Sequence, residues 1–386
     1  MNSAISNLFT STPSVIRMQQ TYSGRQITQA GRAFLNYESL VKNQEEFNKV
    51  MEVLSYWRLC HEAPLSYAWD VLRDKVGKHD QDALFGKRLK RYVSIYYKLK
   101  RFEKMTLRNM QDIGGCRAII SSERKLRRSV RDLKLMPNFQ TLEGSYRSKD
   151  YIKKPKADGY RGYHLVGRFS NGIEKPRNVE IQLRTKIQHY WATALEIVDL
   201  FTGQALKSNQ GQDSWSRFFV EASRQLAVMD EVPKFHSLTR VEKLRRYHSR
   251  VHSNPLMVQS CLDAHKRLGD LRVVKKFTAY ANSIEIIDQK IHKSPDSAYV
   301  LLTVDITNKK VHSKVFTDDR SKAAERSYIK AEKAAAQVND QVVALVSTSV
   351  VGGIKEAYPN FFADSSEFLY HLDIIRVVAE HLKSVS

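Results

Sequence analysis

The fold of this chain is decided by residues 147–185, RSKDYIKKPKADGYRGYHLVGRFSNGIEKPRNVEIQLRT. Residues 163–170 and 178–185 are short and rich in apolar side chains, and the turn-like NGIEKPRN joins them, so we predict two neighbouring strands. In the second strand Glu180, Gln182 and Arg184 alternate with three aliphatic residues. A strand places alternate side chains on opposite faces, so the three polar groups are expected on one face. A half-exposed edge strand would show the same alternation.

The segments on either side extend these two strands into a small α/β module. The glycine pair 114–115 precedes CRAIISS, which is typical of a buried strand over 116–122. Apolar residues recur at helical spacing over 29–60, 92–102 and 186–201, which predicts helices there. The expected order is helix, strand, strand, strand, helix, an α/β (α+β) fold with its polar residues at the strand ends.

The charge of the chain points to polyanionic partners. The 386 residues include 63 Lys plus Arg and 41 Asp plus Glu, a formal charge of +22. Residues 296–386 carry a net charge of −1, whereas residues 84–108 hold nine basic residues and one acid. We therefore expect a phosphate site near 84–108. Three widely spaced cysteines exclude a disulfide framework, and neither a membrane span nor a secretory signal is recognisable, which predicts a soluble, cytoplasmic protein with no membrane partner.

Side chains must build that phosphate site, because the sequence contains neither a GxxxxGK[ST] loop nor a GxGxxG motif after a strand. If residues 88–102 form a helix, Arg88 begins it, and Lys90, Ser94 and Lys98 lie four apart on one face. Such a row of cations with a hydroxyl can hold a triphosphate chain. A solvated basic helix face is the alternative.

Two further groups of residues carry potential chemistry. Asp112 lies just before the strand that contains Arg117; a single aspartate at such a turn is more often a cap. The basic loop with Lys154 and Lys156 leads into Tyr160 and His164, a pattern that can neutralise phosphates and stack a purine base.

Taken in order, RxKxxxSxxxK, DIGGCR, DYIKKPKADGYRGYH, VEIQLRT and HYWATALE resemble the synthetase domain of the RelA/SpoT family over about residues 40–230. The resemblance implies a nucleotidyltransferase-like mixed sheet flanked by helices. It also implies an enzyme that moves the β,γ-pyrophosphate of ATP to the 3′-hydroxyl of GDP or GTP.

The resemblance assigns roles by motif position. Mg²⁺ would be held by Asp112 and Glu180, and Glu180 would also be the base for the acceptor hydroxyl. The catalytic set is Glu180, Asp112, Arg88 and His164. The ATP-binding set is Arg88, Lys90, Ser94, Lys98 and Arg117, and the acceptor-binding set is Lys154, Lys156, Tyr160, His164, Gln182 and Arg184.

We expect four regions along the chain. They are an N-terminal tail (1–28), the synthetase domain (29–230), a basic helical linker (231–274) and an α+β regulatory or interaction domain (275–386). In the last region, strands are expected at 298–306, 310–316 and 342–350, with a turn at Asn308-Lys309 and a helix at 321–338. The length preceding the synthetase helices leaves no room for the family's hydrolase, so His79-Asp80 is expected to be a loop feature.

Three functions remain open from the sequence. The first is alarmone synthesis from ATP and GDP or GTP. The second is a toxic family member that pyrophosphorylates the 3′ CCA end of tRNA or adenosine nucleotides, with the C-terminal domain as a fused antitoxin or phage sensor; the net charge of +7 over residues 231–295 favours an RNA partner. The third is a degenerate synthetase that only binds nucleotide or RNA. Homo-oligomers are common among the small members of the family, and the partner of the C-terminal domain is undefined.

Overall fold

The computed structural model describes residues 21–40, 42–141, 143–170, 172, 175–202, 213–278, 297–305, 310–320, 323, 324, 326–328, 330, 331, 341–347 and 361–385. The chain divides into two compact units. The sheet unit comprises residues 11–152 and 162–185, and the helical unit comprises 1–10, 153–161 and 186–386. The boundary therefore falls at residue 185, with the loop 153–161 in the helical unit, and differs from the predicted boundary at 230.

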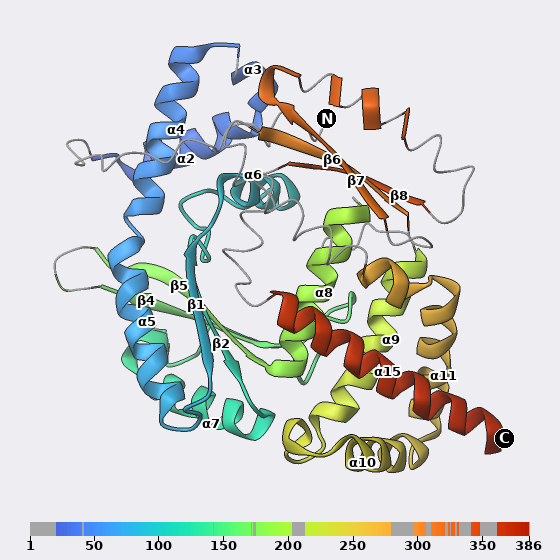
Figure 1. Ribbon diagram of the computed structural model, residues 1–386. Helices are drawn as coiled ribbons and strands as arrows, with labels where there is room; N and C mark the ends of the chain where they lie inside the picture. The colour runs from blue at the N-terminus through green and yellow to red at the C-terminus, as the bar shows by residue number, and fades with distance from the viewer. Residues whose placement is uncertain are drawn as a thin grey trace. The chain divides into compact units, whose positions relative to one another are not determined.

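The sheet unit is built on a five-stranded mixed sheet in the order β1-β2-β5-β4-β3 (Figure 1). Strands β2 and β5 run parallel, and the other pairs are antiparallel. The predicted fold class, a mixed sheet flanked by helices, is confirmed. The elements are α2 (Gly24–Leu35), α3 (Tyr37–Leu40), α4 (Gln44–Leu59), α5 (Glu62–Gly77), β1 (Leu84–Leu89), α6 (Tyr92–Arg101), β2 (Gly114–Ile120), α7 (Glu123–Lys134), a 3₁₀ turn (Pro137–Phe139), β3 (Ser148–Asp150), β4 (Tyr163–Phe169) and β5 (Arg177–Thr185).

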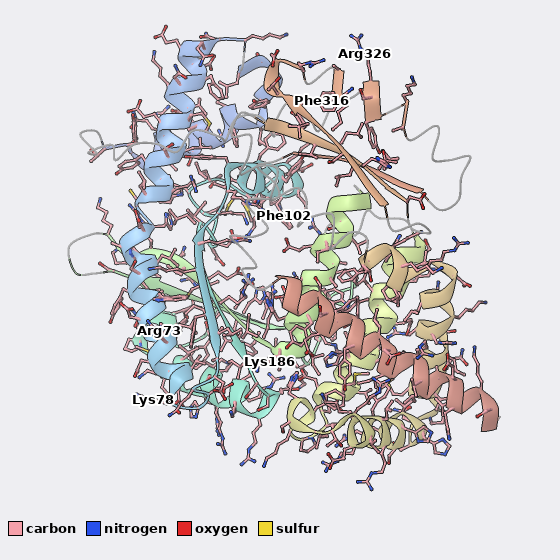
Figure 2. All side chains as sticks on the ribbon, in the orientation of Figure 1. Arg73, Lys78, Phe102, Lys186, Phe316 and Arg326 are labelled. Atoms are coloured by element: carbon pink, nitrogen blue, oxygen red, sulfur yellow. The ribbon has the colours of Figure 1, made fainter. Side chains whose placement is uncertain are left out.

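One face of this sheet carries the hydrophobic core. Val179, Ile181 and Leu183 of β5 are completely buried and pack with apolar side chains of α5 and α7. The alternation predicted for this strand is confirmed, because the intervening polar residues lie on the opposite face. Exposed cations such as Arg73 in α5 and Lys78 at its C-cap lie on the outer side of this layer (Figure 2).

Two sequence predictions in this unit are wrong. Residues 29–60 form α2, α3 and α4 instead of one helix, because the chain turns at Asn36 and again at Asn43, whose side chain caps α4 by accepting from the Glu46 N–H. Residues 88–91 are not helical, since β1 extends to Leu89 and pairs with β2. Helix α6 begins at Tyr92, so the prediction over 92–102 holds.

The helical unit combines packed helices with a three-stranded antiparallel sheet in the order β7-β6-β8. Its core includes Phe368 of the C-terminal helix, which is fully buried and stacks on Phe219 with a centroid distance of 6.3 Å. The elements are α8 (Lys186–Thr202), α9 (Asp213–Asp230), a 3₁₀ turn (Phe235–Ser237), α10 (Arg240–His252), α11 (Pro255–Asp270), β6 (Ser297–Asp305), β7 (Lys310–Thr317), a 3₁₀ turn (Asp318–Arg320), β8 (Gln341–Ser347) and α15 (Phe361–Val385).

Most of residues 231–274, the range predicted as a basic helical linker, belongs to two packed helices. These are α10 and α11, and the buried residues Tyr247 of α10 and Cys261 of α11 pack into the helical unit. The predicted turn at 308–309 and most of the predicted helix at 321–338 lie outside the described residues, as do residues 1–20 of the predicted tail. No helix in the described part of the chain has the length and apolar character needed to cross a membrane.

Candidate active site on the polar face of the sheet

Cross-strand register gathers the predicted polar residues on the face of the sheet opposite the core. Residues that are paired directly across strands share a face. One row runs Arg88, Gly115 and Glu180 from β1 to β5. The next row joins Arg117, Gln182 and His164 from β2 to β4. The sheet therefore brings five predicted site residues from four strands into two adjacent rows.

Glu180 is the centre of a hydrogen-bonded chain on this face. His164 Nδ1 lies 3.0 Å from Glu180 Oε1, and Gln182 Nε2 donates to Glu180 Oε2 at 2.8 Å. Arg184 in turn donates to Gln182 Oε1 at 3.0 Å. Burial raises the pKa of Glu180, but the hydrogen bond and charge of His164, the Gln182 amide and the charge of Lys98 outweigh burial and lower it to about 2. The carboxylate is therefore held ionised at neutral pH.

Asp112 is the second carboxylate, and two lysines hold it. Lys90 Nζ and Lys98 Nζ lie 2.9 and 2.8 Å from Asp112 Oδ2. Burial lowers the pKa of Lys90, although the neighbouring charge of Asp112 opposes this effect. Charge coupling links the two carboxylates, since Lys90 interacts with both and Lys98 acts on Glu180. The structure thus brings Lys90, Lys98, Asp112 and Glu180 together.

The donor set fits a Mg²⁺ ion that is also bound by phosphate oxygens. Oδ1 of Asp112 is buried and accepts no hydrogen bond from the described residues, so one carboxylate oxygen remains available. The described residues contain no group of three or more His, Cys, Asp or Glu able to hold a metal ion alone. Two carboxylates without a third protein ligand match the preference of Mg²⁺ for water and substrate phosphates in its remaining positions.

The remaining ATP-binding predictions are placed by β1, β2 and α6. Arg88 is exposed on β1 and Arg117 is half-buried on β2. Ser94 is half-buried in α6, one turn before Lys98. The predicted helical row that included Lys90 is corrected, because Lys90 precedes α6 and reaches Asp112 from the end of β1, where its N–H also donates to the Ile113 carbonyl at 2.7 Å.

The predicted acceptor residues Lys154, Lys156 and Tyr160 belong to the helical unit, so they do not share a compact unit with the two carboxylates. Lys156 Nζ lies 4.6 Å from the centroid of the Tyr160 ring, and Trp191 meets that ring edge-on at 6.4 Å. Ser223 of α9 donates to the Gly159 carbonyl. The loop is thereby docked on the helices of its own unit.

Two positioning residues escaped the sequence reasoning. Arg58 of α4 donates to the Lys90 carbonyl at 2.9 Å and stacks on Tyr92 at 4.3 Å, which fixes the segment that carries Lys90. Tyr151 packs edge-on against His164 with a centroid distance of 5.2 Å. Tyr151 lies inside the motif that carried the resemblance, whereas Arg58 has no local sequence signal.

Comparison with known proteins places the similarity over this site. Residues 87–197 match the family model described as a region found in RelA / SpoT proteins. Two GTP pyrophosphokinases of Bacillus subtilis (strain 168) are similar: YwaC is 32% identical over 120 residues, covering 28% of this chain and 52% of YwaC. YjbM is 32% identical over 111 residues, covering 28% of this chain and 51% of YjbM.

Two solved structures are similar to part of the chain. The small alarmone synthetase 2 from Bacillus subtilis is 23% identical, with a TM-score of 0.38, and the match covers 47% of this chain and 94% of that one. The small alarmone synthetase 1 from the same species, bound to its product pppGpp, is 25% identical, with a TM-score of 0.35. The match covers 44% of this chain and 90% of that one. The chain spans about half the length of the curated relatives it matches.

Proposed function

We propose that the protein is an ATP-dependent pyrophosphokinase that transfers the β,γ-pyrophosphate of ATP to the 3′-hydroxyl of GDP or GTP, producing a (p)ppGpp-type alarmone. The observation that carries the proposal is the pairing of two carboxylates with cations on the polar face, where Lys90 and Lys98 converge on Asp112 beside Glu180. The match of residues 87–197 to the RelA/SpoT model supports it.

In this proposal the basic residues bind the phosphates and the acidic residues bind the metal ion. When ATP binds, Lys90 and Lys98 leave their ion pairs with Asp112 and bind the phosphates of ATP. Arg88 and Arg117 add positive charge on the same face. Asp112 and Glu180 would hold Mg²⁺, and the bound ion would supply positive charge to offset the negative charge of the phosphates. Phosphoryl-type transfer depends chiefly on positioning and electrostatic stabilisation, which fixed cations on a sheet supply.

Glu180 accepts a hydrogen bond from the 3′-hydroxyl and orients it. It is a weak base, so full removal of the proton is the smaller part of its role. A carboxylate with a pKa of about 2 binds a proton weakly. A loose transition state leaves the attacking hydroxyl with little charge until late in the reaction, so orientation of the hydroxyl matters more than basicity. Gln182 and Arg184 fix the carboxylate in this role.

For the acceptor, Tyr160 offers a ring for base stacking, and Lys154 and Lys156 offer charge for its phosphates. Lys156 lies over the Tyr160 ring. We therefore expect Lys156 to leave the ring for the acceptor phosphates when a base stacks there.

The proposal is tested by incubating the protein with ATP labelled in its β and γ phosphates, Mg²⁺ and GDP, GTP, AMP or deacylated tRNA, and resolving the products. Label in GDP or GTP products is the expected result. Glu180→Gln keeps the side-chain size and should reduce transfer by at least about 100-fold. Full activity of that variant would disprove the assigned role of Glu180.

The exposed cationic side of α10 favours one alternative, an RNA acceptor at the tRNA 3′ end. Arg245 and Arg250 are exposed there, and Arg246 lies beside them. A protein that contacts RNA phosphates loses affinity steeply with salt. Label transferred only to tRNA, with a steep salt dependence, would replace the mononucleotide proposal with this one.

A further inference from the structure

Helix α7 presents one of its arginines, Arg127, to the edge of the sheet. Glu123, one turn earlier on the helix, accepts from Arg127 Nε at 3.0 Å and lies 2.9 Å from Nη2. This pair leaves Nη1 of Arg127 to donate to Asp150 Oδ2 of β3. The guanidinium is therefore held in one orientation, between a carboxylate of its own helix and a carboxylate of the sheet.

The strand register explains why Arg127 and Asp150 meet. Asp150 is paired across the β3–β4 ladder with Tyr163, so both side chains share one face of the sheet. Tyr163 is buried in the core to which α5 and α7 contribute. Arg127 also lies over the Tyr163 ring, with its Cζ 5.9 Å from the centroid. Arg127 thus reaches β3 from the core side of the sheet.

Strand β3 is short and lies at the edge of the sheet. It has three residues and stands last in the strand order, next to β4. A short edge strand gains little from backbone pairing and belongs to the parts of a domain that open easily. The charge-assisted hydrogen bond from α7 is therefore a substantial share of what fixes β3.

Asp150 also shapes the start of the loop that follows β3. Its Oδ1 accepts from the Ile152 N–H at 3.1 Å, a local turn of the kind that aspartate favours. The Tyr151 N–H donates to the Gly162 carbonyl at 2.9 Å. The chain leaves the sheet unit after Ile152 and returns to it at Gly162. Asp150 therefore holds the base of the loop 153–161 closed.

The same turn directs Tyr151 to the polar face. The Tyr151 ring meets His164 edge-on at 5.2 Å, and His164 Nδ1 lies 3.0 Å from Glu180 Oε1. A series of contacts thus runs from Arg127 through Asp150 and its turn to the ring of Tyr151 and on to His164. It crosses from the core face to the polar face at the β3 edge of the sheet.

We infer that Arg127 is a positioning residue for the acceptor nucleotide: through Asp150 it holds the base of the loop 153–161 closed and keeps Tyr151 against His164. This inference rests on the proposed function, because that loop carries the residues proposed to bind the acceptor. ATP binding should not depend on Arg127, since the cations proposed for ATP lie on β1, β2 and α6, and β1 and β2 are at the other end of the strand order.

Hydrogen exchange of the full chain tests the structural step and requires no activity. Arg127→Met removes the charge and keeps an apolar stem, and Arg128→Met is the matched control, because Arg128 is exposed on the same helix. In Arg127→Met we expect amide exchange in peptides covering 148–152 to become at least about tenfold faster, with exchange in β5 unchanged. The control should change exchange in 148–152 less than about twofold. Unchanged exchange at 148–152, or equal acceleration in β5, would overturn the role of Arg127.

Nucleotide binding tests whether the acceptor depends on this link. Equilibrium dialysis of the same proteins uses GDP as the acceptor probe and a non-hydrolysable α,β-methylene analogue of ATP as the donor probe. The Kd for GDP should rise at least about fivefold in Arg127→Met, while the Kd for the ATP analogue changes less than about twofold. Arg127→Lys, which keeps a charged donor, should bind GDP more tightly than Arg127→Met. Equal weakening of both nucleotides would overturn the inference.

A double-mutant cycle identifies Asp150 as the intermediary. Asp150→Asn retains an oxygen for the Ile152 N–H but loses the charge with which Arg127 pairs. Combining it with Arg127→Met should weaken GDP binding less than about twofold beyond Arg127→Met alone. Losses that multiply would show that Arg127 acts by another route. Failure of the proposed function is read separately, because a wild-type protein that binds GDP but transfers no pyrophosphate would overturn the reaction and leave the dialysis result on Arg127 standing.

Discussion

At the residue scale, the polar face of the sheet unit places one carboxylate with a lowered pKa, Glu180, near a second carboxylate that is paired with two lysines. Glu180 is ionised because donors and cations surround a buried carboxyl group, and Asp112 is balanced by Lys90 and Lys98. The sequence could predict these residue types from strand alternation and motif order. It could not predict that Lys90 and Lys98 reach the same carboxylate oxygen from different elements, because that depends on where β1 ends and α6 begins.

If the proposed transfer is the reaction, replacing Lys98 by Met should reduce it about 100- to 1,000-fold, because the cation assigned to the donor phosphates is lost. The measurement is kcat under saturating ATP and acceptor. Lys100→Met is the matched control on the same helix, since Lys100 is exposed and lies over the Tyr96 ring instead of near Asp112. An equal loss of kcat in Lys100→Met and Lys98→Met would show that only the net charge of α6 matters.

Because the pKa of Glu180 is lowered in the folded protein, we expect the unfolding free energy to decrease in acid. The folded-state pKa is lowered from 4.5 to about 2, so the stabilising contribution is present above pH 4.5 and is lost as the pH falls towards 2. The difference in unfolding free energy between the wild type and Glu180→Gln should shrink by about 2 kcal/mol between pH 7 and pH 3. Urea unfolding at several pH values measures it. A difference that is constant over this range would contradict the proposed hydrogen-bond network.

Gly159 is required by both its backbone and its surroundings. Its φ is +90°, and a Cβ would lie 3.1 Å from the Ser223 Cβ and 3.2 Å from the Phe219 carbonyl oxygen. Gly159→Ala should therefore undock the loop and increase amide exchange in residues 153–161. Gly144→Ala is the control, because Gly144 has a φ of +72° and no atom within 4 Å of the added methyl. If both variants leave exchange in 153–161 unchanged, the close approach at Gly159 is unimportant.

At the scale of elements, the sequence predicted the strands that carry the motif and missed several elements around them. Strands β2, β4 and β5 have apolar, β-branched patterns and turn residues that are readable locally. β1 was missed because LFGKRL is as basic as the helix that follows, and only its pairing with β2 makes it a strand. β3 is short and has no pattern of its own, and α10 was read as part of a linker because its buried face is narrow.

The His79-Asp80 pair illustrates how neighbouring residues can serve different elements. His79 Nε2 lies 2.7 Å from Asp132 of α7, while Asp80 accepts from the Ser121 N–H at 2.6 Å and from Lys125 at 3.0 Å. The two side chains thus have separate structural partners. Asp80 connects the end of α5 to the start of α7.

Asp80→Asn should lower the unfolding free energy of the sheet unit by about 2 to 3 kcal/mol, since the Asp80 side chain is completely buried and Lys125 loses its partner. Denaturant unfolding followed by circular dichroism measures the change. Asp74→Asn removes an exposed carboxylate from the same helix and should leave stability unchanged within error. A small effect at Asp80 would mean that α7 is fixed by its apolar face alone.

At the scale of the whole molecule, the C-terminal helix is part of the helical unit's core. Phe368 stacks on Phe219 of α9 and meets Phe277 at 5.4 Å, and Cys261 Sγ of α11 lies 3.8 Å from the Ile375 carbonyl. Removal of residues after about 270 therefore strips α15 from the core formed by α8, α9 and α11. We therefore expect such a truncation to destabilise the helices against which α15 packs.

Phe368→Ala should destabilise the helical unit by about 3 to 5 kcal/mol, because a fully buried aromatic ring is replaced by a cavity. Amide hydrogen exchange in α9, α11 and α15 measures the stability of the helical unit separately from that of the sheet unit. Leu256→Ala, at a position that is 75% exposed, is the control and should change nothing measurable. Retention of slow exchange in α15 after Phe368→Ala would show that the helix is held elsewhere.

The parallel pairing of β2 with β5 also fixes when the polar face can form during synthesis. Lys90, Lys98 and Asp112 leave the ribosome before α7, β3 and β4, while Glu180 follows on β5, the last strand of the sheet unit in chain order, which inserts between β2 and β4. Until β5 is in place, no strand joins β2 to β4, and His164 lacks its carboxylate partner Glu180. A nascent chain that ends before Glu180 therefore lacks the second carboxylate of the polar face, and the two carboxylates come together only once β5 has paired with β2.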